Sequence, residues 1–534
     1  MALLLSQSEL ARTEPADRAA FESPVPTQIV SNGEFNPLPQ TTQQRRVEDR
    51  IKEIADAIAP KLGLDRRQFL RTGSGMAAAF LAMNDVFGPL FAVDRAEAAE
   101  PGAAAERANG LAGQFILDDQ VHFVRDDFQG EKLLDLAKYA SVHWNPDMLK
   151  DAGMTLARYK FDNFVKEVYV DSDTKIALLS GAPFDDPNWW LLTNDQIARA
   201  RKVVNNLAGS RRLLAHSVIT PKQPGWMEEV DRCIAEVKPE SWKGYTIGDP
   251  LNPQSTKYPW RLDDEKLMYP FYEKAVKAGI NTICIHKGLL PRDYEKSAAN
   301  AWQYATVDDL GKAAKDWPQM NFVIYHAALR QFLESPDDDL AEFEKTGHIL
   351  WASDLAAIPQ KYGVSNVYGE VGTAFANSAV ANPRFAAALM GTLIKGMGFD
   401  HIVWGTDSVW YGSPQWQIEA LWRFKIPQAL REKYGYPELT ERAKRKILGL
   451  NNARLYGIKN VDGRLVTPEE CEDEHDDRYH PVPLNYEALI PISLKRTMEF
   501  PGFALNDHLT KLRERYLASG PAPSNTRHGW VRKA

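Results

Sequence analysis

The sequence predicts an α/β protein whose central domain is a closed (β/α)8 barrel. Two observations lead to this prediction. From residue 112 onward, short runs rich in Val, Ile, Leu and aromatic residues alternate with longer segments of helical periodicity, a pattern typical of repeated βα units. Eight strand candidates can be counted, and eight parallel strands with crossover helices close most naturally into a TIM barrel. A signal-like N-terminal segment and a C-terminal extension flank this domain.

After a long insert behind the first strand, the strand candidates recur at intervals of roughly 30 to 45 residues. They are Gln114–Phe123, Lys175–Ser180, Arg212–Val218, Trp242–Ile247, Asn281–His286, Asn321–His326, Asn366–Val371 and His401–Thr406. Helices are expected between them at Thr193–Leu207, Asp263–Gly279, Thr306–Trp317 and Arg384–Gly398. An open doubly wound sheet is the alternative, but no glycine-rich phosphate loop follows the first strand.

The N-terminal region precedes the barrel and is expected to carry no catalytic residue. Residues 1–64 are expected to be largely disordered, because most of this stretch holds few clustered large apolar residues. Residues 65–98 resemble a twin-arginine export signal, in which Arg66 and Arg67 precede a weakly apolar, Ala-rich stretch and a small-x-small sequence that starts at Ala96. We therefore predict export to the periplasm or beyond. The alternative is a cytoplasmic protein in which this segment packs on the main domain as a helix.

Composition and charge exclude several classes of protein. The chain has 534 residues, and its 64 basic and 71 acidic residues give a net charge of −7. This balance disfavours nucleic acid as a partner, because binding it requires a basic surface. Three cysteines without paired spacing exclude a disulfide framework and a cysteine-based zinc finger. No uncharged apolar run reaches about 18 residues, so no integral membrane span is expected.

Polar side chains end the predicted strands, at the edge where the active site of a TIM barrel lies. The first strand ends in Asp118, Gln120 and His122, which strict alternation places on one face, toward the barrel interior. Burying three polar groups without partners is costly, so a bound cation is a natural explanation. The later strands end in further candidates, namely His286, His326, Glu370 and Asp407.

These residue types predict a site for one divalent metal ion. Neutral imidazoles and a carboxylate suit Zn²⁺ first, with Fe²⁺ or Mn²⁺ as alternatives. The candidate metal ligands are His122, His286, Asp407, Gln120 and Asp118. One coordination position would remain for a water molecule, whose pKa such a metal lowers toward neutrality. His326, or Asp407 if it leans off the metal, is the candidate general base.

Other polar residues of the strands and of the C-terminal region are mainly expected to have structural roles. Glu370 either orients a neighbouring group or is a structural carboxylate, and it is also a candidate substrate contact. His216 is expected to be a core histidine, Lys243 a surface lysine and Cys284 a small buried residue. The Cys471–His480 segment lies in a run of acidic residues and is expected to be solvated rather than to bind a metal.

At these residues the chain resembles the amidohydrolase-related family of metal-dependent TIM-barrel enzymes, the branch that includes aminocarboxymuconate-semialdehyde decarboxylase. The family's first strand carries Asp-x-His-x-His, where this chain has Asp118-x-Gln120-x-His122. The family's histidines on strands five and six match His286 and His326, and its Gly-Ser-Asp on strand eight resembles Gly405-Thr406-Asp407. The resemblance covers about residues 112–458. It implies that His122, His286 and Asp407 bind the metal and that His326 assists catalysis.

Gln120 stands where the family has a histidine, and this departure leaves the reaction open. An amide oxygen is a weaker ligand than an imidazole, so the metal affinity falls or the preference shifts toward Fe²⁺ or Mn²⁺. The first hypothesis is a metal-dependent hydrolase in which a metal-activated water attacks a small organic substrate. The alternatives are a metal-dependent non-oxidative decarboxylase at the same site and a barrel that has lost both its metal and its chemistry.

Aromatic residues near the predicted mouth of the barrel favour a flat or aromatic small-molecule substrate. Trp410 and Trp416 follow strand eight, and Trp410 is the candidate substrate contact together with Glu370. The other interpretation is that these aromatic side chains only pack loops against the C-terminal extension. That extension, residues 459–534, is expected to dock on the barrel or on a partner subunit, which makes a homo-oligomer one hypothesis.

Overall fold

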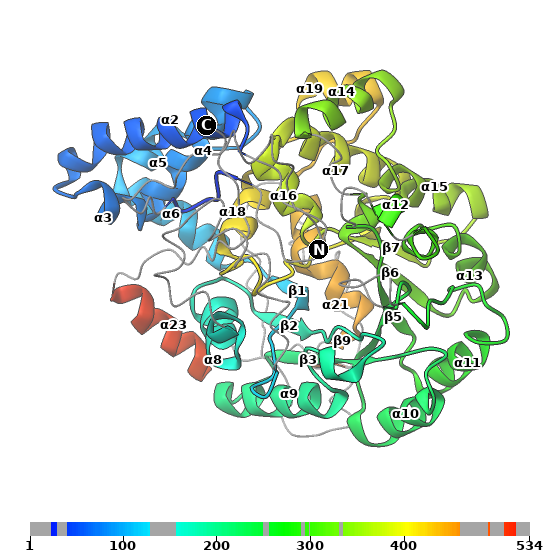
Figure 1. Ribbon diagram of the computed structural model, residues 1–534. Helices are drawn as coiled ribbons and strands as arrows, with labels where there is room; N and C mark the ends of the chain where they lie inside the picture. The colour runs from blue at the N-terminus through cyan, green and yellow to red at the C-terminus, as the bar shows by residue number, and fades with distance from the viewer. Residues whose placement is uncertain are drawn as a thin grey trace.

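A computed structural model describes residues 23–28, 40–128, 156–248, 256–289, 294–297, 299–330, 335–459, 490–491 and 507–519. At its centre, eight parallel strands follow one another in sequence order and curve into a barrel (Figure 1). The strands are β1 (Leu117–Val121), β2 (Ile176–Leu179), β3 (Leu213–Val218), β4 (Ser241–Tyr245), β5 (Thr282–His286), β6 (Asn321–Tyr325), β7 (Val367–Glu370) and β8 (Ile402–Val403). The predicted TIM-barrel fold is therefore confirmed, with each predicted strand present and each shorter than expected.

The barrel closes where the chain that follows β8 meets β1. The Asp407 amide donates to the Gln120 carbonyl at 2.9 Å. Val121 and Ser408 form an isolated parallel bridge at the same seam. Closure of this kind removes both edges of the sheet and brings the C-terminal ends of the first and last strands together.

A β-bulge interrupts the alternation of β1. Along its pairing with β2, β1 advances by three residues from Asp118 to Val121 while β2 advances by two. The extra residue places Asp119 and Gln120, although consecutive, both toward the barrel interior, and His122 follows Gln120 on that side. Strict alternation therefore fails at Asp118, which the bulge separates from Gln120 and His122.

Helices cover the outside of the barrel (Figure 1). Those that follow β1 are α8 (Phe161–Val165), α9 (Asn194–Ala208), α10 (Trp226–Arg232), α11 (Tyr269–Ala278), α12 (Tyr294–Ser297), α13 (Leu310–Asp316), α14 (Pro336–Thr346), α15 (Ala352–Tyr362), α16 (Ala374–Ala381), α17 (Pro383–Met397), α18 (Gln415–Arg423), α19 (Gln428–Tyr434), α20 (Glu441–Arg445), α21 (Asn451–Leu455) and α23 (His508–Ala518). The four predicted helices correspond to α9, α11, α13 and α17. Helix α9 begins with a capping box at Thr193 and ends at Gly209, whose φ is 74°.

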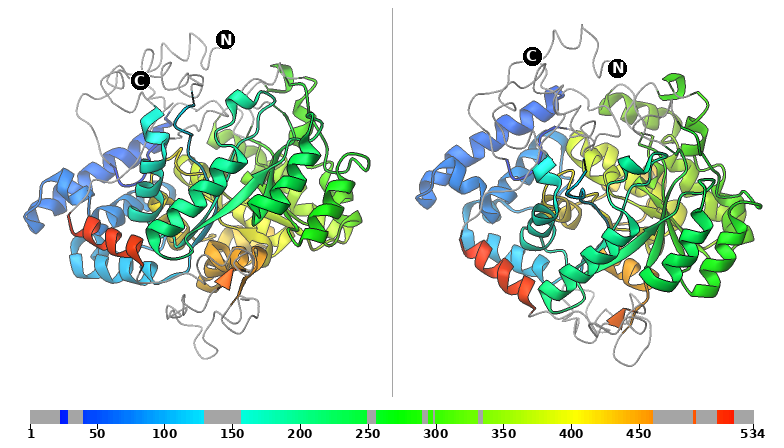
Figure 2. Two further views of the ribbon diagram at one scale, coloured as in Figure 1. Left: turned by 90° about the horizontal axis from the view of Figure 1, so that it is seen from below. Right: turned by 60° about the horizontal axis from the view of Figure 1, so that its bottom comes forward.

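The N-terminal region forms a group of helices on one side of the barrel, next to α23 (Figure 2). These helices are α2 (Thr42–Ile58), α3 (Arg66–Leu70), α4 (Gly73–Phe87), α5 (Arg95–Ala99) and α6 (Pro101–Ala112). Helix α2 lies within the stretch expected to be largely disordered. Its capping box at Thr41 and the buried Val47, Ile51 and Ala55 on one face explain why it forms.

The apolar stretch of the signal-like segment is helix α4, and it is packed against the rest of the protein. Phe80 is completely buried, with its ring 4.9 Å from that of Phe91 and the Arg423 guanidinium 5.4 Å from its centroid. Arg423 also forms an ion pair with Glu97 of α5 at 2.6 Å. The segment therefore adopts the packed arrangement that the sequence left as the alternative to an export signal, and the route of export stays a prediction.

Two C-terminal elements fasten the barrel from outside. Asn452 of α21 donates to the carbonyls of Leu117 and Trp404 at 2.8 Å each, which ties β1 to the chain after β8. Before α23, Asp507 forms an ion pair with the buried Arg212 at 2.9 Å, so this part of the C-terminal extension docks on the barrel. The Cys471–His480 segment lies outside the described residues.

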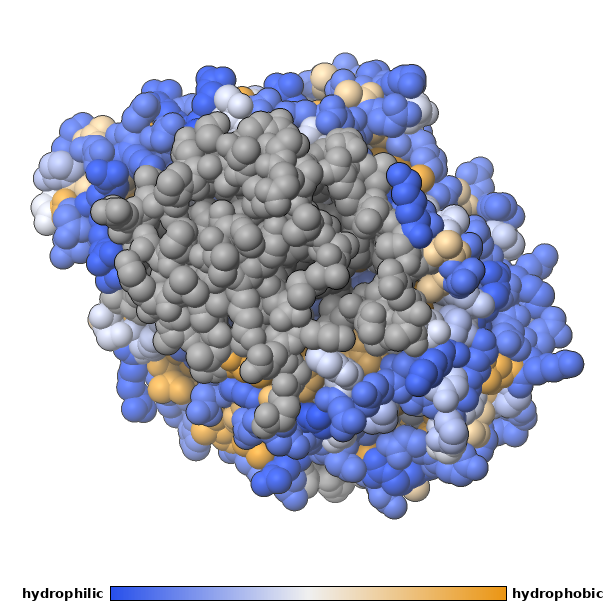
Figure 3. All heavy atoms as spheres, viewed as in Figure 1, coloured by the Kyte–Doolittle hydropathy of each residue, from blue (hydrophilic) through white to orange (hydrophobic). Residues whose placement is uncertain are grey.

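Most of the described surface in the view of Figure 3 is hydrophilic, and hydrophobic side chains gather over α8 and α9. The large apolar side chains that remain exposed include Val203 and Leu207 on α9 and Leu512 and Leu517 on α23. Within the part of the chain that the structure describes, no helix is long and apolar enough to cross a membrane.

Candidate functional site

Four polar side chains meet at the C-terminal end of the barrel, and we call them the Gln120 cluster. Gln120 and His122 come from the end of β1, His326 follows β6 and Asp407 follows β8. The Gln120 amide nitrogen lies 3.1 Å from Asp407 Oδ1, 3.4 Å from His326 Nε2 and 3.5 Å from His122 Nε2. His122 Nε2 lies 3.2 Å from Asp407 Oδ1. All four side chains are buried.

The tautomers of the two histidines follow from their outer contacts. His122 Nδ1 lies 2.8 Å from the Ser180 carbonyl oxygen, and His326 Nδ1 lies 2.9 Å from the Gly372 carbonyl oxygen. A carbonyl oxygen only accepts, so each Nδ1 must carry the hydrogen. In a neutral imidazole the other nitrogen then carries a lone pair. Both Nε2 atoms therefore present lone pairs to the Gln120 cluster.

The Gln120 cluster is short of hydrogen-bond donors. Two imidazole lone pairs and a carboxylate oxygen face the Gln120 amide nitrogen, which has only two hydrogens to donate. His122 Nε2 and Asp407 Oδ1 also face each other directly without a hydrogen between them in these protonation states. The buried Gln120 Oε1 has no hydrogen-bond partner among the described residues. The arrangement calls for a cation or an added proton.

The backbone at three strand ends lies in the left-handed region, which holds these side chains in place. The φ angle is 61° at His326, 58° at Thr373 and 58° at Asp407. Non-glycine residues adopt this region rarely, at a cost on the order of 1–3 kcal/mol, and such residues gather at functional sites. The Thr373 hydroxyl donates to Asp407 Oδ2 at 2.7 Å and lies 3.0 Å from the Tyr411 hydroxyl. Sequence analysis missed Thr373, although a polar residue three positions after a strand end was the available signal.

Glu370 lies beneath His326 rather than at the surface of a pocket. Its side chain is completely buried, one carboxylate oxygen accepts from the His326 amide at 2.9 Å, and the other accepts from the Gly372 amide. The Gly372 carbonyl in turn accepts from the His326 ring. Glu370 therefore holds the His326 backbone directly and the His326 ring through Gly372. Burial, and secondarily the charge of Asp119, raises the pKa of Glu370 well above its usual value. Of its predicted roles, orientation of a neighbouring group agrees with this placement.

The Asp118 carboxylate is held by Thr406 and by the backbone amide of Gln120, at 3.2 Å, rather than by the side chains of the Gln120 cluster. It accepts from the backbone amide of Thr406 at 2.9 Å and from the Thr406 hydroxyl. Burial raises its pKa to about 7, against the opposing effect of these hydrogen bonds. The bulge in β1 is the reason for this placement, because it turns Asp118 away from the face that Gln120 and His122 share. Asp118 therefore joins the chain after β8 to β1 and does not sit with the other predicted ligands.

His286 lies next to His326. The centroids of the two rings are 4.8 Å apart in an edge-on arrangement, and the Tyr245 ring stacks on His286 at 4.4 Å. Tyr245 ends β4 and was not singled out from the sequence. The structure thus brings His286 to the same end of the barrel as His122 and Asp407, while its closest ring contacts are with His326 and Tyr245.

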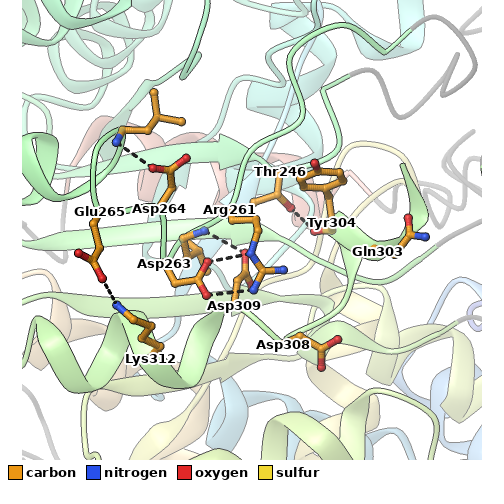
Figure 4. Close-up of polar contacts among 12 residues, drawn as sticks. Thr246, Arg261, Asp263, Asp264, Glu265, Gln303, Tyr304, Asp308, Asp309 and Lys312 are labelled. Atoms are coloured by element: carbon orange, nitrogen blue, oxygen red, sulfur yellow. Dashed lines mark hydrogen bonds and ion pairs between the residues drawn. The ribbon is translucent and has the colours of Figure 1, made fainter. Parts of the chain in front are cut away.

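The chain after His286 is anchored by a buried ion pair. Lys287 Nζ lies 3.0 Å from both oxygens of Asp309 and donates to the Tyr304 carbonyl at 2.8 Å. The Thr246 hydroxyl donates to the same carbonyl at 2.6 Å (Figure 4). The Tyr304 carbonyl therefore joins the ends of β4 and β5, the two strands that carry the stacked Tyr245 and His286.

A second buried network fills the barrel interior below the Gln120 cluster. Lys243, expected at the surface, is completely buried, with its ammonium 3.6 Å from the centroid of the Tyr325 ring. That expectation was wrong, because alternation within β4 turns Lys243 inward. Asp119 accepts from the Tyr456 hydroxyl at 2.9 Å, and burial raises its pKa while Lys243 opposes the shift. The expectation that His216 is a core histidine is confirmed, and its Nε2 lies 2.9 Å from the Tyr325 hydroxyl.

Trp410 lies against the Gln120 cluster, as a substrate-contacting residue requires. Its ring stacks on the His122 ring with centroids 5.8 Å apart, and it meets the Tyr159 ring at 5.1 Å. A groove of about 410 Å³ begins at Phe123, the residue after His122, and is also lined by Arg125 and Arg199. The groove therefore lies beside the chain that follows β1.

The donor set of the Gln120 cluster fits a divalent cation if Gln120 presents its amide oxygen rather than its nitrogen. Among the described residues, no group of three or more His, Cys, Asp and Glu side chains is arranged to hold a metal ion. His122 Nε2 and Asp407 Oδ1 are nevertheless 3.2 Å apart with their lone pairs facing. The third donor has to come from Gln120, whose amide suits a metal only through its oxygen. Nitrogen and oxygen donors of this kind suit Zn²⁺, Fe²⁺ or Mn²⁺.

Comparisons with known proteins find one family model and several solved structures. Residues 208–458 match the family model described as amidohydrolase, which confirms the resemblance seen in the sequence. A search of curated proteins finds no match. Similar solved structures include an uncharacterized TIM-barrel protein from Bordetella bronchiseptica, with a TM-score of 0.41 and 12% identity over 64% of this chain and 97% of that one.

Two further similar structures are enzymes. One is 4-oxalomesaconate hydratase from Rhodopseudomonas palustris, with a TM-score of 0.36 and 14% identity over 64% of this chain and 95% of the hydratase. The other is a dihydroxybenzoic acid decarboxylase from Polaromonas sp. JS666 with bound manganese and 2-nitroresorcinol, with a TM-score of 0.38 and 13% identity over 64% of this chain and 97% of the decarboxylase.

Proposed function

We propose that this barrel, whose residues 208–458 carry the amidohydrolase family pattern, is a metal-dependent hydrolase that acts on a small organic substrate at the Gln120 cluster. One observation carries the proposal. The lone pairs of His122 Nε2 and His326 Nε2 and a carboxylate oxygen of Asp407 converge on one buried point at the C-terminal end of the barrel. Active sites of TIM barrels lie at this end.

His122, Asp407 and the amide oxygen of Gln120 are the residues that would hold the metal ion. A divalent cation bound there would polarise an oxygen of the substrate and lower the pKa of water. Manganese or iron suits this oxygen-rich set at least as well as zinc, since the only imidazole in it is that of His122. An added proton on His122 would also relieve the cluster, and metal analysis separates the two cases.

His326 is the residue we assign to proton transfer. Its Nε2 carries a lone pair, because its Nδ1 hydrogen is held by the Gly372 carbonyl. Glu370 fixes the His326 backbone at 2.9 Å, so the lone pair keeps its direction during a reaction. His286, in edge-on contact with the His326 ring, is placed to receive a substrate group or to pass a proton on. Asp407 is oriented by Thr373 and contributes its charge to the same point.

Trp410 is the substrate contact that we propose, since its ring covers His122 at the mouth of the site. A flat, aromatic substrate would extend this stack. The same residues would also serve a decarboxylation, in which the carboxylate of the substrate takes the place next to the cation. The two reactions are separated by their products, because only decarboxylation releases CO2.

The test is metal analysis of the purified protein combined with a substrate panel. We expect about one equivalent of Mn, Fe or Zn by elemental mass spectrometry, and its loss in His122→Ala and Asp407→Ala. His326→Ala should keep the metal and lose turnover on amides, esters and hydroxybenzoates followed by chromatography and CO2 release. A protein that takes up none of these metals would refute the proposal, and loss of the metal in His326→Ala would refute the role of His326.

A further inference from the structure

The two ends of the Gln120 amide face opposite requirements. Its nitrogen faces Asp407 Oδ1 and the two imidazole lone pairs, whereas its oxygen is buried without a hydrogen-bond partner among the described residues. An amide oxygen left unsatisfied in the interior is costly. In this orientation the amide therefore provides a donor to Asp407 but leaves its own oxygen without a hydrogen bond among the described residues.

The side of the unsatisfied oxygen is lined by a carboxylate. A methyl group placed on Gly372 would lie 2.9 Å from Gln120 Oε1 and closer still to Glu370 Oε1. Both oxygens thus crowd the same face of Gly372, and both are acceptors. Half a turn of the amide would bring its NH2 group to this side, next to Glu370 Oε1, an oxygen that already accepts a hydrogen bond from the Gly372 amide.

The same half turn would place the amide oxygen among lone pairs on the other side. The oxygen would then face His122 Nε2, His326 Nε2 and Asp407 Oδ1, all of which are acceptors in the tautomers fixed by Ser180 and Gly372. Without a positive charge that arrangement is repulsive. With a divalent cation it supplies a neutral oxygen ligand next to an imidazole and a carboxylate. A cation therefore decides which orientation is the more stable.

We propose that Gln120 is a reversible metal ligand whose amide turns over when the metal binds. In one orientation its nitrogen donates to Asp407 and faces the Nε2 atoms of the two histidines. In the other its oxygen joins His122 and Asp407 in holding the metal, and its nitrogen donates toward Glu370. This inference rests on the proposed function, since it presupposes that the Gln120 cluster takes up a metal. It predicts a metal that exchanges readily, because binding has to break the hydrogen bonds of the amide.

Two variants of Gln120 test this proposal by metal affinity and by stability, independently of activity. Gln120→Glu offers an oxygen to each side and has no hydrogen to donate. Gln120→Leu offers neither a donor nor an acceptor. Isothermal titration of the metal-free full-length protein with MnCl2 should show about tenfold tighter binding for Gln120→Glu, because the new ligand is charged, and about tenfold weaker binding for Gln120→Leu.

Thermal unfolding in EDTA tests the orientation itself. Gln120→Glu should unfold at a lower temperature than the wild type, since a carboxylate then faces both Asp407 and Glu370, and added MnCl2 should reverse most of the loss. If Gln120→Glu were as stable as the wild type in EDTA, the amide would not donate in the resting protein, and the turnover of the amide would be refuted. If Gln120→Leu bound Mn²⁺ as tightly as the wild type, Gln120 would not be a ligand.

Metal binding by the wild type and by the Gln120 variants distinguishes failure of the proposed function from failure of the proposed role of Gln120. A wild-type protein that binds neither Mn²⁺ nor Zn²⁺ overturns the proposed function together with this inference. A wild-type protein that binds Mn²⁺ while Gln120→Leu binds it equally well overturns the inference alone. If one variant does not fold, as circular dichroism would show, the other still decides whether Gln120 contributes to binding.

Discussion

Replacing Phe80 by alanine tests whether the signal-like segment is part of the folded protein. Phe80 is 0% exposed, its ring lies 4.9 Å from the ring of Phe91, and the Arg423 guanidinium covers it at 5.4 Å. Removal of a fully buried phenyl ring leaves a cavity and costs about 3–5 kcal/mol. The free energy of unfolding of Phe80→Ala, from urea denaturation followed by circular dichroism, should fall by this amount.

Phe80→Leu is the matched control, because it keeps most of the volume and should cost less than about 1.5 kcal/mol. A loss below about 1 kcal/mol in Phe80→Ala would mean that helix α4 does not pack on the barrel in solution, and the reasoning would be refuted. The mass of the mature protein gives a second check. Cleavage after Ala98 would remove α4 and separate Arg423 from its ion-pair partner Glu97, so a folded protein should retain both.

Two further predictions concern buried groups away from the Gln120 cluster. Burial lowers the pKa of Lys444, which donates to the Trp422 carbonyl, from 10.5 to about 7. Between pH 7 and 10.5 the unfolded chain therefore binds one more proton at Lys444 than the folded protein does. The free energy of unfolding should rise by roughly 2 kcal/mol from pH 7 to 9. Urea denaturation at both pH values should show that Lys444→Met loses this increase. An unchanged increase in that variant would contradict the assignment. Tyr325→Phe removes the hydroxyl that lies 2.9 Å from His216 Nε2 and donates to the Asp119 carbonyl at 2.6 Å. The free energy of unfolding should therefore fall by about 2–4 kcal/mol in the same measurement. A fall of less than about 0.5 kcal/mol would contradict the importance of this network.

The fold was largely predictable because it depends on patterns that recur along the chain. Eight apolar runs spaced by helical segments specify the barrel without any knowledge of individual contacts. The predicted helix Thr193–Leu207 agrees with α9 to within one residue at each end, because the capping sequence at Thr193 is a local signal. Helix α2 was missed because its burial depends on packing against other helices, which composition alone does not reveal.

The candidate site was predictable only in part. His122, His326 and Asp407 were found because each ends its own apolar run, and the structure brings them together around Gln120. Asp118 was misplaced, since a bulge is a property of the pairing of two strands and not of one strand's sequence. Thr373 was missed because a polar residue after a strand end is a weak signal by itself, and the left-handed backbone that positions it cannot be predicted from the residue type.

The bulge in β1 has a consequence for how this site can change over evolutionary time. Its single extra residue is what turns Gln120 and His122 inward after the inward-facing Asp119. Deleting either Asp119 or Gln120 would restore regular pleating, remove one buried polar side chain and leave His122 facing inward. Substitutions can only tune the site one group at a time. A change of length in this one strand could remove a polar group and the bulge together while the apolar runs that specify the barrel stay intact.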